Sequence, residues 1–147
     1  VTLDLLIHDA DLVMALMPGA FKSVSARGTS VYTHSADDIT ADIVFESGAT
    51  ASLTAGRTAD EITRAMRIEY ASGVISLDFV NRDFSNSTPY ALNVDFANTA
   101  QGKDPLGANV ERFIDAVFGE TDMPLVSGEG GARALQLALA IDKAAGF

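Results

Sequence analysis

The stretch ADIVFESGATASLTA, residues 41–55, decides the fold class of this 147-residue chain. Apolar and polar residues alternate on both sides of Ser47 and Gly48, which is the pattern of two strands joined by a short turn. Glycine at such a turn supplies a backbone conformation that other residues rarely adopt. The stretch therefore predicts an antiparallel hairpin.

Further strands are predicted on both sides of this hairpin. Weak alternation marks residues 22–27 upstream, and clearer alternation marks residues 64–70, 74–79 and 92–96 downstream. The short segment 71–73 provides a turn between two of these runs. Several strands joined by short turns, with one apolar face, are typical of an antiparallel sheet.

Helices are predicted at both ends of the chain. Residues 1–17 are mostly apolar and reach the helix-stop pair Pro18-Gly19. Asp104 and Pro105 are a typical helix start. The helix that follows ends at Gly119 and carries an apolar stripe of Leu106, Val110, Phe113, Ile114 and Val117.

A last helix begins near Ser127 and runs towards Gly146, with the glycine-rich residues 128–131 as its starting loop. The order is therefore a helix, about five strands and two helices. This order predicts one α+β domain, in which helices pack on one face of a predominantly antiparallel, open-faced β-sheet.

The composition excludes several classes of function. Twenty acidic residues against ten basic ones give a net charge of −10, which argues against nucleic-acid binding. No basic run suggests a membrane surface, and no apolar stretch reaches transmembrane length. The chain has no cysteine and no signal peptide, so we expect a cytoplasmic protein without disulfides.

Asp4, His8 and Asp11 form the most informative polar pattern. Their spacing places them on one stripe of a helix that is otherwise mostly apolar and is expected to be buried. A carboxylate one turn from an imidazole is suited to proton transfer. The alternatives are a favourable acid in the first helical turn, a satisfied core histidine and a solvated aspartate. A metal site on this stripe is a further alternative, although one helix rarely supplies a full ligand set.

The stretch DLLIHDAD, residues 4–11, resembles the D-x-x-x-H-D-x-D signature of the glucose-fructose oxidoreductase / inositol dehydrogenase (Gfo/Idh/MocA) family. Three further stretches resemble the family in the right order. They are the hairpin at 41–51, the strand pair at 57–77 and the segment PLVSGEGGARAL at 124–135. The resemblance covers almost the whole chain.

The resemblance implies a two-domain oxidoreductase, of which residues 1–147 are the C-terminal domain for substrate binding and oligomerisation. An N-terminal Rossmann domain, which is not in this chain, would bind NAD or NADP. The residues agree, because no G-x-G-x-x-G motif follows a predicted strand here. The expected reaction is oxidation of a CH–OH group of a sugar, polyol or derivative, and this chain alone is expected to be inactive.

The resemblance also assigns roles to residues. It implies that His8 is the acid/base or a ligand of the substrate hydroxyl, and that Asp4 orients it or binds a neighbouring hydroxyl. Asp11, Arg57 and Lys103 are candidate substrate ligands, with solvent-facing charge as the alternative. Arg64 is a further possible ligand with the same alternative. No residue is assigned to cofactor or metal.

Two further hypotheses concern partners. The chain could be a non-catalytic ligand-binding or assembly module of the same family. The second face of the sheet is expected to be exposed, or to mediate a homodimer by packing against the same face of another copy. The residues that make this face mixed and partly polar are Val44, Ser52, Thr54, Arg67, Glu69 and Asp78.

Overall fold

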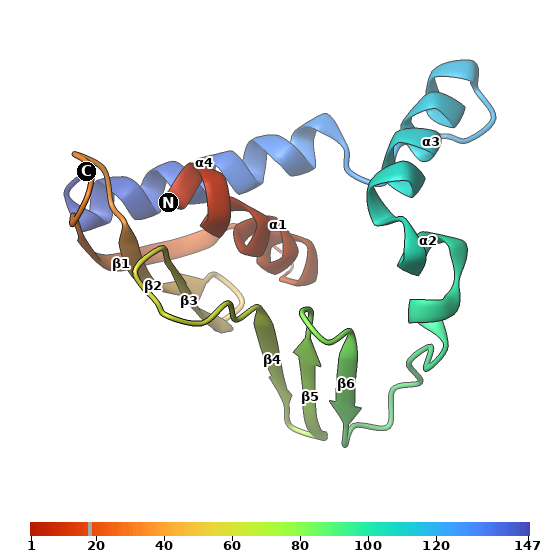
Figure 1. Ribbon diagram of the computed structural model, residues 1–147, viewed down its shortest axis with the longest axis horizontal. Coiled ribbons are helices and arrows are strands. Elements are labelled where there is room, and N and C mark those ends of the chain that lie inside the picture. The colour runs from red at the N-terminus through yellow and green to blue at the C-terminus, as the bar shows by residue number, and fades with distance from the viewer. Residues whose placement is uncertain (18) are drawn as a thin grey trace. The chain divides into compact units, whose positions relative to one another are not determined.

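The computed structural model describes residues 1–17 and 19–147. They form two compact units, one of Val1–Ala59 with Val126–Phe147, and one of Asp60–Leu125. Figure 1 shows their helices and strands in order along the chain. Pro18 of the predicted helix stop lies outside the described residues. No helix in the described ranges is long and apolar enough to cross a membrane.

The sheet of the first unit consists of β1 (Phe21–Thr29), β2 (Asp38–Phe45) and β3 (Thr50–Gly56) in that order, all antiparallel. The hairpin predicted at 41–55 is confirmed as β2 and β3, with Ile43 opposite Ala51 and Ala41 opposite Leu53. Gly48 has a φ of 86° at the turn. This value explains the glycine, because other residues rarely adopt a positive φ.

One face of this sheet forms the core of the first unit. The alternating side chains of Ile39, Ala41, Ile43 and Phe45 are almost completely buried. They pack in one cluster with residues of α1 (Ile7–Leu16) and α4 (Gly128–Ala145). The π-helical turn η1 (Thr2–Leu6) precedes α1 and contributes Leu6 to the same cluster. In this unit, helices therefore pack on one face of an antiparallel sheet, as predicted.

The opposite face of the same sheet is exposed and carries small polar side chains. Ser52 donates a hydrogen bond to Asp42 at 2.5 Å across the β2–β3 pair. The hydroxyls of Thr40 and Thr54 lie 3.4 Å apart in the next cross-strand pair. Val44 is a large exposed hydrophobic residue on this face. The predicted open-faced sheet is present in this unit.

The second unit has its own antiparallel sheet, made of β4 (Ala65–Tyr70), β5 (Gly73–Asp78) and β6 (Asp83–Asn86). The strands predicted at 64–70 and 74–79 are confirmed as β4 and β5. The helical elements that follow are η2 (Phe96–Asn98), α2 (Ala100–Lys103) and α3 (Pro105–Phe118). The α+β class with antiparallel strands is confirmed, but the strands fall into two three-stranded sheets instead of one.

The strand predicted at 92–96 is wrong. These residues form a turn and the start of η2, and β6 occupies the edge of β5 instead. The Asn93 side chain accepts a hydrogen bond from the N–H of Asp95, and the Asn93 carbonyl accepts one from Phe96. Asparagine often starts turns through such local bonds, so here the turn overrides the alternation of apolar residues.

The predicted helix ends are confirmed by their hydrogen bonds. The Asp104 carboxylate accepts the N–H of Gly107 at the start of α3, and the Ser127 hydroxyl accepts the N–H of Gly130 at the start of α4. Gly119 ends α3 in the left-handed conformation. Residues 128–131 form the first turn of α4, so they are a helix start, as the sequence indicates.

Candidate functional site

The N-terminal helical segment carries three of the predicted site residues. Asp4 lies in η1, His8 lies in the first turn of α1, and Asp11 lies one turn later. Asp4 and His8 are exposed and Asp11 is half-buried, so the predicted burial of this helix is wrong for the side that carries them. The reason is that a different side of the segment packs into the core. That side is formed by Leu6, Ala10, Val13 and Met14. The polar stripe is therefore open to a ligand.

Arg57 lies directly after β3 and reaches the N-terminal segment. Its Nη2 donates to Oδ2 of Asp4 at 2.6 Å, and the two side chains are 43% and 69% exposed. The structure thus brings together two predicted site residues that are 53 positions apart. An exposed ion pair adds little to stability, so the pair is better suited to ligand contact than to holding the fold.

Asp37 anchors the loop between β1 and β2. Its Oδ2 accepts the N–H groups of Val31, Tyr32 and Thr33 at 2.8, 2.7 and 3.1 Å. Hydrogen bonds from the main chain of Tyr32 and Val31 lower the pKa of the buried Asp37 carboxyl from 3.8 to about 2. The carboxylate therefore fixes a loop that presents Tyr32 and His34 to solvent.

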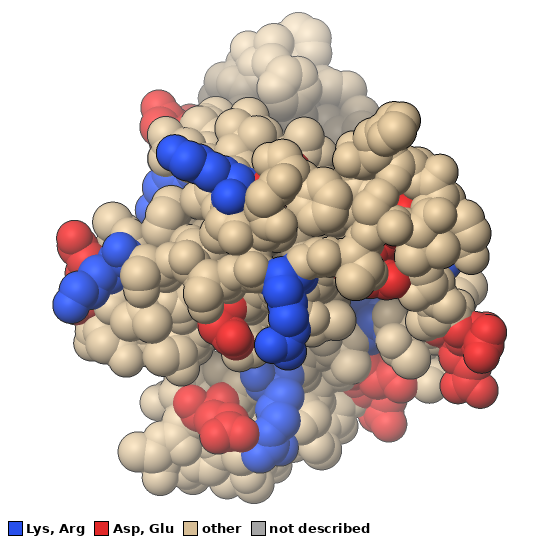
Figure 2. Space-filling view, turned by 90° about the vertical axis from the view of Figure 1, so that its left-hand side faces the viewer, with Lys and Arg blue, Asp and Glu red and all other residues tan. Residues whose placement is uncertain are grey.

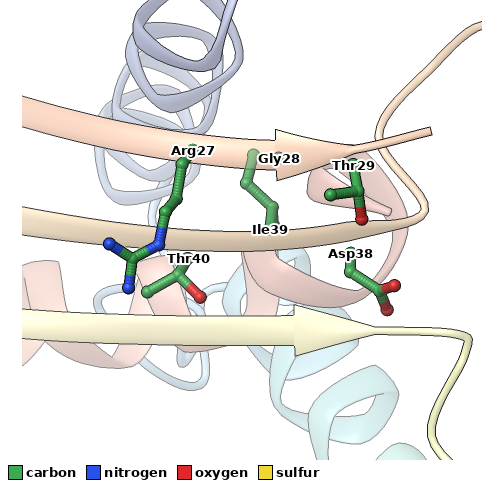
Figure 3. A pocket seen from close by; sticks show the side chains of 6 residues that line it. All are labelled: Arg27, Gly28, Thr29, Asp38, Ile39 and Thr40. Carbon is green, nitrogen blue, oxygen red and sulfur yellow. The ribbon is translucent and has the colours of Figure 1, made fainter.

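A shallow depression of about 160 Å³ lies on the exposed face of the first sheet. Figure 3 shows the guanidinium of Arg27 beside Thr40 at one end and the carboxylate of Asp38 beside Thr29 at the other. Its lining is completed by Gly28 and Ile39. The depression contains neither Asp4 nor His8, although its lining residue Asp38 accepts the N–H of Arg57.

Lys103 and Arg64 lie in the second unit. Lys103 is the exposed last residue of α2. The guanidinium of Arg64 lies 5.5 Å from the centre of the Phe79 ring, in a cation–π contact within its own unit. The predicted role of Lys103 in substrate binding stays a prediction, as do the roles of Asp4, His8, Asp11 and Arg57.

The described residues offer no fit for a dinucleotide cofactor. A dinucleotide cradle needs a parallel strand–loop–helix unit with a glycine-rich turn. Both sheets are antiparallel, and residues 128–131 open α4 after a loop instead of a strand. Over residues 1–17 and 19–147, no three His, Asp or Glu side chains group as a metal ion would require.

Charges of both signs are mixed on the surface. On the face in Figure 2, Lys and Arg side chains stand between Asp and Glu side chains, and neither sign forms a broad patch. An exposed ion pair on β4 is an example, in which Nε of Arg67 lies 2.8 Å from Oε1 of Glu69. On the displayed face, a ligand would meet individual charged groups of both signs.

Comparison with known proteins decides the family. The sequence profile of the GFO/IDH/MocA C-terminal domain matches residues 1–76. The chain belongs to the Gfo/Idh/MocA family. The predicted family membership is thereby confirmed, and the match includes the segment with Asp4 and His8 as well as Arg57.

A sequence match and a structural match to the same kind of enzyme from one organism extend the likeness within the family. The chain is 32% identical to the UDP-N-acetylglucosamine 3-dehydrogenase of Acidithiobacillus ferrooxidans, over 96% of this chain and 47% of the relative. The solved structure of GnnA, the enzyme of that name from the same organism, has a TM-score of 0.82 and 30% identity. The structural match covers 98% of this chain and 46% of the GnnA chain. The chain thus spans about half the length of these relatives.

A more distant structure shares the fold. WlbA dehydrogenase from Bordetella pertussis, solved in complex with NADH and UDP-GlcNAcA, matches with a TM-score of 0.74 at 17% identity. The match covers 95% of this chain and 44% of WlbA. At this identity the likeness shows the fold alone, and it extends over both units of the chain.

Asp37 and Asp38 organise the surroundings of Arg57, and neither residue is predicted from the sequence. The only signal is their position, since two adjacent acids precede a strand and follow a loop rich in serine and threonine. Such acids often accept main-chain hydrogen bonds from nearby turns. The sequence does not reveal that Asp38 holds the distant segment with Arg57 and Thr58.

Proposed function

We propose that this chain is the substrate-binding domain of an NAD- or NADP-dependent dehydrogenase. Its substrate is a hydroxyl-bearing carbon of a sugar, a polyol or a derivative such as a nucleotide sugar. The observation that carries the proposal is the exposed ion pair of Asp4 and Arg57. The carboxylate of this pair lies four residues before His8 in the same helical segment. The likeness to a UDP-N-acetylglucosamine 3-dehydrogenase supports the substrate class.

In this proposal, His8 handles the proton of the substrate hydroxyl. Oxidation of an alcohol removes a hydride from carbon and a proton from oxygen, and an exposed imidazole within hydrogen-bond reach accepts that proton. Imidazole is suited to the task because it changes charge near neutral pH. The hydride acceptor is a nicotinamide that a separate N-terminal domain binds, so this chain alone turns over no substrate.

The neighbouring charged groups bind and orient the sugar. The carboxylate of Asp4 accepts hydrogen bonds from sugar hydroxyls, and Arg57 donates to hydroxyl or phosphate oxygens. Asp11 lies one helical turn after His8 and is a further hydroxyl ligand. Lys103 is proposed as a further substrate ligand. We place the reaction in the cytoplasm, where the nicotinamide cofactors are available.

The test compares the two histidines of the chain in the complete protein. His8→Ala is expected to lower kcat with UDP-N-acetylglucosamine and NAD by about 10²- to 10⁴-fold, the usual contribution of a general base. His34→Ala is the matched control, because His34 is exposed on the loop that Asp37 holds, and it should keep the wild-type rate. A wild-type rate in His8→Ala would contradict the role of His8.

We further propose that the exposed face of the first sheet mediates a homodimer. Its small side chains allow a second copy to approach closely, and a two-fold axis makes one such face complementary to itself. Val44→Glu places a charge on this face and is expected to convert a dimer to a monomer in light scattering. Val31→Glu, at an exposed loop position, is the control and should stay dimeric. A wild-type protein that is monomeric at high concentration would overturn this proposal.

A further inference from the structure

Asp38, the first residue of β2, holds the main chain that carries Arg57. Its Oδ1 accepts the N–H groups of Arg57 at 3.2 Å and of Thr58 at 3.3 Å. Its Oδ2 accepts the hydroxyl of Thr58 at 2.5 Å. Three hydrogen bonds from two consecutive residues therefore end on one carboxylate. This arrangement restrains the segment directly after β3, in which Arg57 is the first residue.

Gly56 makes the close approach of this carboxylate possible. Asp38 and Gly56 lie opposite each other in the β2–β3 ladder. A Cβ atom on residue 56 would lie 2.2 Å from Oδ1 of Asp38, which is far inside van der Waals contact. A side chain at position 56 would push the carboxylate away from the two N–H groups that follow. The glycine and the aspartate thus work as a pair.

The other half of the ion pair is tied to the same short run of chain. The main-chain nitrogen of Val1 donates to the carbonyl of Ala36 at 2.9 Å, which fixes the start of η1 three residues before Asp4. The N–H of Arg57 also donates to the carbonyl of Asp37 at 3.0 Å. Residues 36–38 therefore set the positions of both segments whose side chains meet in the Asp4–Arg57 pair.

We propose that Asp38 is a positioning residue of the substrate site: it acts through Arg57, whose guanidinium it holds at Asp4. This inference rests on the proposed function, because it assigns Arg57 to substrate binding. Arginine has many rotatable bonds, and a substrate that met a freely moving arginine would bear the entropy cost of ordering it. A main chain that is already fixed lowers this cost before the substrate arrives.

The test measures KM and kcat of the complete protein with UDP-N-acetylglucosamine and NAD. Asp38→Ala removes all three hydrogen bonds and is expected to raise KM about tenfold, as the loss of bonds to a charged group implies, with little change in kcat. Asp38→Asn keeps one oxygen that accepts the two N–H groups, so it should restore most of the affinity. A variant Asp38→Asn as poor as Asp38→Ala would overturn the positioning role, since only the charge would then matter.

Two comparisons separate positioning from general stability. In an Arg57→Ala background, Asp38→Ala should raise KM no further, because the residue through which it acts is gone. A second tenfold rise there would overturn the proposal. Asp78→Ala is the matched control, since the Asp78 carboxylate also accepts two main-chain N–H groups, those of Val80 and Asn81, both at 2.9 Å. It should leave KM unchanged.

A structural measurement keeps the inference independent of the reaction. In Asp38→Ala, the main-chain N–H of Thr58 loses its bond to Asp38 and should exchange with solvent faster. The N–H of Arg57 keeps its bond to the Asp37 carbonyl, so its exchange should quicken by a smaller factor, and the guanidinium protons of Arg57 should follow. Unchanged exchange at all three places would overturn the positioning role. If the wild-type protein shows no turnover, the proposed function fails, while faster exchange in the variant would still establish that Asp38 fixes Arg57.

Discussion

The two units of the chain differ in how they bury apolar surface. In the first unit, Leu6, Ile43 and Leu137 are completely buried between helices and sheet. In the second unit, Ile75 is the only hydrophobic residue that is buried among those described, and the apolar stripe of α3 is exposed. An amphipathic pattern therefore specifies a helix and its ends, but not the surface on which that helix packs.

The largest expected difference is between two alanine substitutions, one of a phenylalanine in each unit. Phe45 on β2 is 1% exposed and Phe113 on α3 is 58% exposed. Phe45→Ala should lower the free energy of unfolding by about 3–5 kcal/mol, because it removes contacts and leaves a cavity. Phe113→Ala should change it by about 0.5 kcal/mol or less, as at other surface positions. Urea unfolding of both variants of the complete protein measures the two values.

An equal loss of unfolding free energy in both variants would contradict the difference in burial between the two units. It would mean that α3 is covered in solution by a surface outside its own unit. Phe118→Ala, at the end of the same helix and 77% exposed, would then show how far the covered surface extends.

Local signals explain which parts of the fold could be predicted. The hairpin needed only alternation and Gly48, and the helix starts needed only Asp104 and Ser127 with their neighbours. Each of these features depends on residues within a few positions of one another. The division into two sheets could not be predicted, because it depends on which strands pair, and alternation does not specify the partner of a strand.

The candidate site could be predicted only in part for the same reason. The D-x-x-x-H spacing identified Asp4 and His8 from one segment, and the family resemblance added Arg57. The predicted burial of the helix with Asp4 and His8 is wrong on the side that carries them, because hydrophobic content alone does not reveal that the core lies on the side of Leu6 and Ala10. The contact of Arg57 with Asp4, and the support from Asp38, depend on long-range register and are visible only in the structure.

A smaller effect concerns the carboxylates that anchor loops, one in each unit. Main-chain hydrogen bonds lower the pKa of Asp37 in the first unit to about 2, and bonds from Asn81 lower the pKa of Asp78 in the second. Because the folded state binds the proton less tightly than the unfolded chain, each carboxylate stabilises the protein above about pH 4. This stability should disappear as the pH falls from about 4 towards 2.

In Asp37→Asn, the stability of the protein should therefore depend less on pH in the acid range. Urea midpoints measured between pH 5 and pH 2 should fall less steeply in Asp37→Asn than in the wild type. Asp78→Asn should show the same change to a smaller extent, since Asp78 is half-buried whereas Asp37 is buried. If the urea midpoints of Asp37→Asn fell as steeply with pH as those of the wild type, the Asp37 carboxylate would not hold its loop in solution as the structure has it.

The smallest effect comes from two helix glycines with opposite expected signs. Gly131 lies in the first turn of α4, and a Cβ there would meet no atom within 4 Å. Gly131→Ala should therefore raise the free energy of unfolding by about 0.5–1 kcal/mol, because alanine loses less backbone freedom on folding. Gly119 ends α3 with a φ of 77°, so Gly119→Ala should lower it by about 1–2 kcal/mol. Thermal unfolding of both variants tests whether the end of α3 is as well ordered as the start of α4, and a neutral Gly119→Ala would show that it is not.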